Sequence, residues 1–571
     1  MELPRVTRWH LANLAALLLA AVAVSAGAAP GARAAGTSAS SATDPNTPVL
    51  VTSERVSGYR LTISQVEQMA SRPAKIRDEL RRHPRLEAYE YTKGPGRWQV
   101  SWFTRGTPQK EMAQVYVDDA TGRVTEAWTG FQVAWTMARG YTGAFGRRVN
   151  ALYVWIPMCV LFVAPFISLR RRPTLWHLDL LMLLGFSISL AFFNHAEIGL
   201  SVPLAYPFLL YLLARMLLLA FGHGRPREPL RVWVPVSWLA VAVVFLVGFR
   251  VGLNVTNSNV IDVGYAGVIG ADKLVHGQAL YGGWPKDNAQ GDTYGPVNYY
   301  AYVPFRAVFG WSGVWDDLPA AHAAAIAFDL LTLLGLYFLG RRIRGPTMGV
   351  LLAYLWAAYP FTLYALSSNT NDTLAALLIV VAFLVIGSAP ARGVAGALAG
   401  MTKFAPLALG PLLLRGASDR WPRPRSIVMF VVAYALTIVV VMLPVLVGGN
   451  FHAFWHDTIT YQSGRGSPFS IWGLWGGLTA EQRLVQGAAA ALAVAVAFVP
   501  ERRGMIEVAA LGAAVLIALQ LGITHWFYLY IPWFFPLVIV ALVGAHPPAG
   551  LSELAGARGS SLWSRRAAVP V

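Results

Sequence analysis

The sequence predicts an all-α polytopic membrane protein that carries a small α+β domain near its N-terminus. Of the 571 residues, 56% are hydrophobic and 13% are charged, whereas charged residues make up about a quarter of a soluble protein. Apolar runs of about 17–23 residues, long enough to cross a bilayer as helices, recur from residue 150 onwards. Residues 49–135, in contrast, have the polar composition of a soluble domain.

The net charge of +17 raises the question of nucleic-acid binding. The arginines, however, stand in short clusters between the apolar runs, which is the pattern of cytoplasmic loops in membrane proteins. The sequence therefore predicts a membrane partner and no nucleic acid. The single cysteine, Cys159, lies within an apolar run, so no intramolecular disulfide can form and the redox compartment stays open.

The N-terminal residues 1–34 have the layout of a secretory signal or of an uncleaved signal anchor. Arg5 and Arg8 precede the apolar run 11–24, and small residues follow it. Residues 35–48 form a linker rich in Ser, Thr, Ala and Gly. Either form of the signal places the next segment outside the cytoplasm.

Residues 49–135 are expected to form an extracytoplasmic α+β domain. The polar segment 62–83 predicts a helix, and a turn from Asp118 to Gly122 predicts a closing hairpin. The strand-like runs are 87–92, 98–103, 113–117 and 123–128. This order, closed by VYVDDATGRVTEAW, resembles a PepSY-type domain. The resemblance implies a binding or regulatory module, and a spacer packed on the membrane domain is the alternative.

The remaining chain, 150–545, is predicted to hold about eleven spans and one re-entrant pair, followed by a cytoplasmic tail, 546–571. The predicted spans are 150–169, 176–194, 203–222, 232–250, 318–340, 347–366, 373–388, 427–447, 485–499, 506–523 and 526–545. With the first domain outside, the arginine clusters of the first three inner loops fall in the cytoplasm, as the positive-inside rule requires. The protein is therefore expected in the plasma membrane.

The apolar stretch 394–414 decides the topology of the second half. As one crossing it would send Arg415 and the arginines after it outside, whereas a re-entrant pair of half-helices returns them to the cytoplasm. We favour the re-entrant pair, because Gly400, Pro406 and Gly410 offer places to break the helix. Irregular backbone at membrane depth is tolerated where it lines a cavity, and Lys403 near its middle is a functional candidate.

The long polar loop 251–317 then falls outside, and it is the predicted floor of an active site. Asp262 in this loop precedes a segment with the spacing of an amphipathic helix. A partly desolvated aspartate near lipid can act as a base on a sugar hydroxyl. A helix N-cap or a solvated acid is the alternative reading of Asp262.

Several segments in this order resemble the polyprenyl-phosphate-sugar-dependent glycosyltransferases of the GT-C fold, most closely the actinobacterial mannosyltransferases. They are Asp262 with its amphipathic helix, HGQALYGG, DTYGPVNYYAYVP, SSNTNDTLAALL, GMTKFAPLALGPLLL, SGRGSPFSIWG and THWFYLYIPWFFP. The likeness covers roughly residues 230–545. Members of the family begin close to the catalytic loop, whereas four spans and a soluble domain precede it here.

The resemblance implies that a sugar, with mannose favoured, moves with inversion from a polyprenyl phosphate to an extracytoplasmic glycolipid or glycan of the cell envelope. Asp262 would be the base. Lys403, Arg465 and His525 would supply positive charge or hydrogen-bond donors to the leaving phosphate. The alternatives are a snorkelling lysine, a solvated loop arginine and an interfacial histidine.

The other predicted substrate-binding residues are Tyr265, Tyr294, Asn298, Asn371 and Asp372. The alternatives are a structural turn around Tyr294 and a helix N-cap at Asn371 or Asp372. No metal site is assigned, although a divalent cation stays open as a cofactor. His452 and His456, at i,i+4 with Asp457, form a candidate ligand set, and a solvated loop helix is the alternative. The rival function is a non-catalytic membrane transporter or sensor whose PepSY-like domain binds ligand.

Overall fold

The computed structural model describes residues 48–107, 109–140, 145–168, 170 and 172–547. The predicted signal, nearly all of the linker and the tail from residue 548 lie outside the described residues. The chain forms two compact units. Within the described residues, one comprises 48–140 with 192–198, and the other comprises 145–191 with 199–547.

The N-terminal unit has the predicted α+β composition. Its five strands form one antiparallel sheet in the order β1-β2-β3-β4-β5. The strands are β1 (Val49–Leu50), β2 (Glu87–Thr92), β3 (Arg97–Phe103), β4 (Glu111–Asp118) and β5 (Val124–Thr129). Trp98, Val100 and Val115 are fully buried and form its core with apolar residues of the helices.

The helix predicted over 62–83 is divided into α2 (Ile63–Ala70) and α3 (Ala74–Arg82). Thr62 caps α2 in a capping box with Gln65. Pro73 occupies the N-cap position of α3. A proline disfavours the helical conformation of the residue before it, which explains the break.

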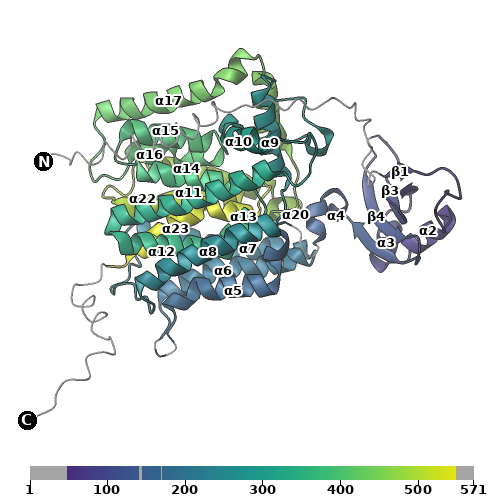
Figure 1. Cartoon of the computed structure of the whole chain (residues 1–571), viewed down its shortest axis with the longest axis horizontal. Helices are drawn as coiled ribbons and strands as arrows, with labels where there is room; N and C mark the ends of the chain where they lie inside the picture. Colours follow the sequence, from purple (N-terminus) through teal and green to yellow (C-terminus); the bar gives the residue numbers. More distant parts are fainter. Residues whose placement is uncertain (1–47, 108, 141–144, 169, 171, 548–571) are drawn as a thin grey trace, which may run out of the picture. The chain divides into compact units, whose positions relative to one another are not determined.

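Seven helices among the described residues are long and apolar enough to cross a membrane, or eight if one bent pair counts as a span. The seven are α6 (Leu175–Asn194), α7 (Ile198–Ala220), α8 (Val236–Thr256), α11 (Pro319–Arg344), α17 (Pro424–Val447), α22 (Met505–Gly522) and the segment Tyr528–Ala545, which comprises η8 (Tyr528–Tyr530) and α23 (Ile531–Ala545). Helix α11 packs on α12 (Pro346–Ala358), and α22 packs on α23, so the helices lie side by side (Figure 1). These helices indicate a multi-pass membrane protein.

The other four predicted spans are shorter or bent. The pair α12 and α13 (Pro360–Ser367) is bent by 59°. The bend occurs at Tyr359, which is extended because it precedes Pro360. The shorter helices are α5 (Leu152–Val163) with η4 (Ala164–Phe166), α14 (Asp372–Leu384) and α21 (Thr479–Ala495).

The stretch predicted as a re-entrant pair folds as a helical hairpin of α15 (Ala389–Gly400), η6 (Ala405–Leu409) and α16 (Gly410–Arg415). The Arg392 guanidinium at the start of α15 donates to the carbonyl oxygens of Leu413 at 2.5 Å and of Leu414 at 3.1 Å. The chain therefore returns to the end of the bundle from which it came. Arg415 also donates to Glu501 O at 3.1 Å, so arginine-bearing loops meet there.

Candidate functional site

The end of α8 and the start of α9 (Asp262–Val275) are held against the turn between α13 and α14. Asn254 Nδ2 donates to Leu366 O at 2.7 Å and to Asn369 Oδ1 at 2.8 Å. Asn369 has a φ of 51°, a left-handed conformation that asparagine tolerates. A Cβ on Gly264 would lie 2.1 Å from Asn369 O, so the first turn of α9 approaches this turn as only glycine permits.

Asp262 is the first residue of α9, and Ile261 occupies the N-cap position without a side-chain hydrogen bond. The N-cap alternative for Asp262 is therefore not what is observed. Its side chain is exposed, yet loss of hydration raises the pKa of its carboxyl, against the opposing charges of Arg465 and Lys403. Protein thus surrounds a carboxylate that water still reaches, a setting suited to a general base.

Lys403 lies in the turn between α15 and η6 and forms an ion pair with Asp372, the first residue of α14. The exposed fraction is 8% for the Lys403 side chain and 1% for that of Asp372. Asp372 also accepts hydrogen bonds from Trp533 Nε1 at 2.8 Å and from Thr370 Oγ1 at 2.5 Å. Lys403 is thus paired within the protein, and the snorkelling alternative is not what is observed.

Three aromatic rings surround the Lys403 ammonium group. Its Nζ lies 5.4 Å from the ring centroid of Tyr294, 5.4 Å from that of Tyr530 and 5.0 Å from that of Trp533. Cation–π contacts of this kind hold a cation in place when it is partly desolvated. Tyr530 and Trp533 were not among the predicted site residues, although the density of aromatic residues after His525 was the available signal.

Tyr294 reaches this position because its loop is bonded to the α15–η6 turn. Gly295 N donates to Thr402 O at 3.2 Å, and Val297 N donates to Met401 O at 3.1 Å. A Cβ on Gly295 would lie 2.0 Å from Met401 O. Gly295 is also the N-cap of α10 (Pro296–Phe309), so the structural-turn alternative is correct for the backbone, while the Tyr294 ring contacts Lys403.

Asn298 on α10 and Asn371 before α14 are both fully buried and contact each other. Asn371 Nδ2 donates to Asn298 Oδ1 at 2.8 Å. Within the described part of the chain, Asn298 Nδ2, Asn371 Oδ1 and the Tyr302 hydroxyl have no hydrogen-bond partner. Exchanging oxygen and nitrogen on both amides leaves one free donor and one free acceptor again. Buried polar atoms without partners are costly, and a ligand hydroxyl could satisfy both amides.

Arg465 and His525 complete the group of charged and polar side chains. The positive charge of Arg465 lowers the pKa of both titratable groups, Asp262 and His525. His525 Nδ1 lies 2.9 Å from Ser467 Oγ. Burial, assisted by the charges of Arg465 and Lys403, lowers the pKa of His525 to about 3. His525 is therefore neutral at pH 7, where it can act as a hydrogen-bond donor and not as a cation.

Tyr265 is the one predicted site residue that lies apart from this group. It is fully buried, and its hydroxyl donates to Asp287 Oδ2 at 3.2 Å. Its ring packs on Trp311 and Trp315, with centroid distances of 5.9 Å and 4.9 Å. These contacts assign Tyr265 to the core beneath α9, and they offer no geometric support for its predicted role in substrate binding.

The described residues contain no group of three or more His, Cys, Asp or Glu side chains that could hold a metal ion. Asp372, the acid that interacts with Asp262, already accepts from Lys403, Trp533 and Thr370. This donor set suits a carboxylate neutralised by an ammonium group and does not fit a divalent cation bridging the two acids. His456 Nδ1 lies 2.7 Å from Asp457 Oδ1, and His452 is not part of that contact.

The group defined by Asp262, Tyr294, Asp372, Lys403, Arg465 and His525 is called the Asp262 cluster below. It combines one exposed acid with two cations and a neutral histidine, and it lies beside the unpartnered amides of Asn298 and Asn371. Such a set of groups can bind an anion next to a hydroxyl group. Comparison of the sequence with protein-family models gives no match, and comparison with curated proteins gives no relative. The function must therefore be argued from these residues.

Proposed function

We propose that the protein is an integral-membrane inverting glycosyltransferase of the GT-C type. It moves a sugar, with mannose favoured, from a polyprenyl phosphate to an extracytoplasmic glycolipid or glycan. The observation that carries the proposal is the buried Lys403–Asp372 ion pair beside the unpartnered amides of Asn298 and Asn371. The charges of Lys403 and Arg465 act on the exposed acid Asp262. The proposal places this site at the outer face of the plasma membrane.

In the proposed reaction, the Asp262 carboxylate takes the proton of the acceptor hydroxyl while that oxygen attacks the anomeric carbon. The new carbon–oxygen bond forms on the face opposite the phosphate, and the bond from that carbon to the phosphate oxygen breaks. The polyprenyl phosphate leaves with both electrons of the broken bond. Lys403 and Arg465 stabilise its developing charge, and preorganised charges of this kind often supply the largest part of a rate enhancement.

The remaining residues of the site fit recognition of the sugar. The paired amides of Asn298 and Asn371 offer one donor and one acceptor, which match a sugar hydroxyl. His525 is held neutral and adds a donor that does not repel Lys403. The proposed topology retains eleven spans, with the α15–α16 hairpin as the re-entrant pair that carries Lys403 to the donor phosphate.

The test is glycosyl transfer by purified protein in lipid, with radiolabelled polyprenyl-phosphate mannose and a crude pool of envelope lipids. We expect Asp262→Asn to lower the transfer rate by about 10²–10⁴, the usual contribution of a general base. Asp317→Asn is the matched control, because Asp317 is an exposed acid of the same loop, and it should transfer normally.

The outcomes separate the parts of the proposal. Equal transfer by wild type and Asp262→Asn would keep the enzyme and remove Asp262 as the base. No transfer by wild type with mannose or with other polyprenyl-phosphate sugars would overturn the transferase. A substrate-linked ion flux in the same vesicles would then favour the transporter.

A further inference from the structure

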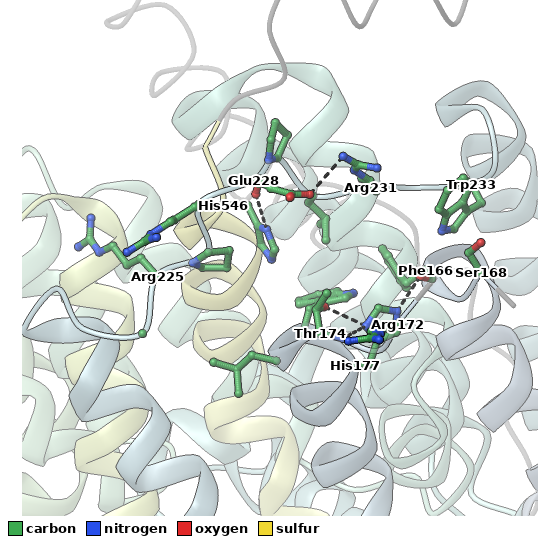
Figure 2. A pocket seen from close by; sticks show the side chains of 17 residues that line it. Phe166, Ser168, Arg172, Thr174, His177, Arg225, Glu228, Arg231, Trp233 and His546 are labelled. Atoms are coloured by element: carbon green, nitrogen blue, oxygen red, sulfur yellow. Dashed lines mark hydrogen bonds and ion pairs between the residues drawn. The ribbon is translucent and has the colours of Figure 1, made fainter. Parts of the chain in front are cut away.

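A second concentration of charged and aromatic side chains lies at the other end of the membrane unit. It surrounds a cavity of about 510 Å³, whose wall is formed by the α5–α6 connection, the α7–α8 connection and His546 (Figure 2). Helix α8 runs from this end, where Trp233 precedes it, to the Asp262 cluster beyond its C-terminus. The cavity therefore belongs to neither the Asp262 cluster nor the proposed reaction.

The lining of the cavity is strongly basic. It contains Arg172, Arg225, Arg227 and Arg231, against a single acid, Glu228. Arg231 pairs with Glu228 at 3.1 Å, and Arg225 pairs with Glu507 outside the cavity. Among the described residues, no ion pair involves Arg172 or Arg227, and both are exposed. Two guanidinium groups are thus available to an anion.

The inner wall is aromatic and contains an unsatisfied donor. Trp176 is 3% exposed, and its ring packs on Phe166 and His546 with centroid distances of 5.1 Å and 5.7 Å. Within the described chain, Trp176 Nε1 has no hydrogen-bond acceptor. A buried donor without an acceptor is unfavourable, and an oxygen of a ligand in the cavity would remove that cost.

The two histidines of the cavity are already committed to the protein. His177 Nδ1 lies 2.9 Å from Thr174 N, and its Nε2 lies 3.0 Å from Phe166 O, which defines the neutral tautomer. His546 Nδ1 lies 3.1 Å from Glu228 O (Figure 2). The positive charge offered to a ligand therefore comes from arginine, which stays charged at all physiological pH values.

The position of the cavity indicates the kind of anion. It lies where α6 begins, α7 ends, α8 begins and α23 ends, all of which are helices long and apolar enough to cross a membrane. Such helix ends lie at the level of the lipid headgroups, where tryptophan is enriched. Arginine forks match phosphate oxygens in pairs, and basic pockets between helix ends bind anionic headgroups.

We infer that this cavity binds the phosphate of an anionic membrane lipid, with Arg172 and Arg227 at the phosphate and Trp176 donating from the inner wall. The lipid fits better than a free phosphate compound, because the wall is aromatic and lies at the membrane surface. The inference does not depend on the proposed glycosyl transfer, since it concerns the opposite end of the helices.

The test uses the full chain purified in detergent and then exposed to phosphatidylglycerol or phosphatidylcholine with the same acyl chains. Bound lipid is counted by native mass spectrometry, and stability is followed as the melting temperature. Wild type should retain phosphatidylglycerol in preference to phosphatidylcholine and melt several degrees higher with it. The double variant Arg172→Gln/Arg227→Gln should lower the apparent affinity at least tenfold.

Two further variants keep the result interpretable. Arg423→Gln/Arg425→Gln removes two exposed arginines of the predicted cytoplasmic face outside the cavity, and it should bind as wild type does. Trp176→Phe keeps an aromatic ring but removes the N–H donor, and it should weaken binding a few-fold. Equal loss in both arginine variants, or no preference for the anionic lipid, would overturn the inference. Stabilisation of the same size by millimolar inorganic phosphate would assign the cavity to a soluble phosphate compound and not to a lipid.

Discussion

Two buried ion pairs of the membrane unit, Arg250–Asp329 and Lys403–Asp372, differ in how completely their surroundings satisfy them. Arg250 contacts both oxygens of Asp329. Its Nη1 donates to Ala357 O and to Thr362 Oγ1, each at 3.1 Å, while Trp356 Nε1 donates to Asp329 at 2.9 Å. Each polar group of this pair has a protein partner, so the pair joins α8, α11 and the α12–α13 bend.

The Lys403–Asp372 pair is also buried, but some polar atoms beside it have no partner. Asn371 precedes Asp372 directly, and its Oδ1, like Asn298 Nδ2, has no partner in the described chain. The exposed Asp262 interacts electrostatically with both members of the pair. We call the Arg250–Asp329 pair closed, because all its polar groups have protein partners, and its role is to hold helices together. The Lys403–Asp372 pair lies beside polar atoms without partners, and those atoms can bind a ligand.

The largest effect on folding is expected from Asp329→Asn. It leaves the Arg250 guanidinium buried without its counter-charge, which costs about 3–5 kcal/mol. Thermal unfolding in detergent should show the loss, while transfer by the remaining folded protein should be close to wild type. A loss of transfer per folded molecule would show that the closed pair also serves the reaction.

The double variant Lys403→Met/Asp372→Leu is expected to separate stability from activity. Replacing both members of a buried pair by apolar residues is often neutral or stabilising, so the melting temperature should change little. Transfer should fall by about 10²–10³, the usual cost of removing one preorganised electrostatic contact. The matched variant Arg250→Met/Asp329→Leu should fold and transfer normally. Equal transfer rates of the two double variants would show that the two ion pairs do not differ in function.

Asp292 is intermediate between the two ion pairs in how fully its carboxylate is satisfied. It is a 3% exposed acid that has a backbone hydrogen-bond partner and a second acid nearby. Burial, with the charge of Asp457 adding to it, raises the pKa of Asp292 from 3.8 to about 6. Between these values the native state keeps a proton that the unfolded state has lost, so stability should fall as the pH rises from about 4 to 6.

The expected size of that loss is on the order of 2 kcal/mol. Melting temperatures at pH 4.5 and pH 7 should show it in wild type, and Asp292→Asn should reduce the difference. An unchanged pH dependence in Asp292→Asn would assign the effect to another acid.

The smallest effect on stability is expected from Tyr302→Phe. The Tyr302 hydroxyl is buried without a partner within the described chain, so its removal should change the unfolding free energy by about 0.5 kcal/mol or less. Chemical denaturation measures this value. A clear destabilisation would show that the hydroxyl has a structural partner, such as a buried water. Tyr302 would then no longer count among the polar groups that a ligand could satisfy.

Much of the fold could be predicted because hydrophobic length and periodicity are local properties. Seven predicted spans are confirmed as long apolar helices, and the predicted strands appear in one antiparallel sheet. The hairpin at 389–415 could be anticipated from the glycines, the proline and the arginines after it. The division at Pro73 and the bend at Pro360 were missed, although a proline marks each.

The site was predicted only as a list of residues. Asp262, Lys403, Arg465 and His525 could be singled out by type and expected sidedness, whereas Tyr265 could not be separated from them. Its neighbours Trp311 and Trp315 are distant in sequence, and only packing shows that they enclose its ring. Tyr530 and Trp533 were missed for the same reason, since their role depends on where Lys403 arrives.

The sequence by itself determined that this is a helical membrane protein with a small α+β domain and with its arginines gathered between the apolar runs. These features follow from the cost of placing polar groups in lipid, which acts on each segment separately. Tertiary structure alone decided which charges meet. A buried charge is stable only beside an opposite charge. Contacts between distant segments decide whether all polar groups around such a pair have partners, as for Arg250, or whether unpartnered amides lie beside it, as for Lys403.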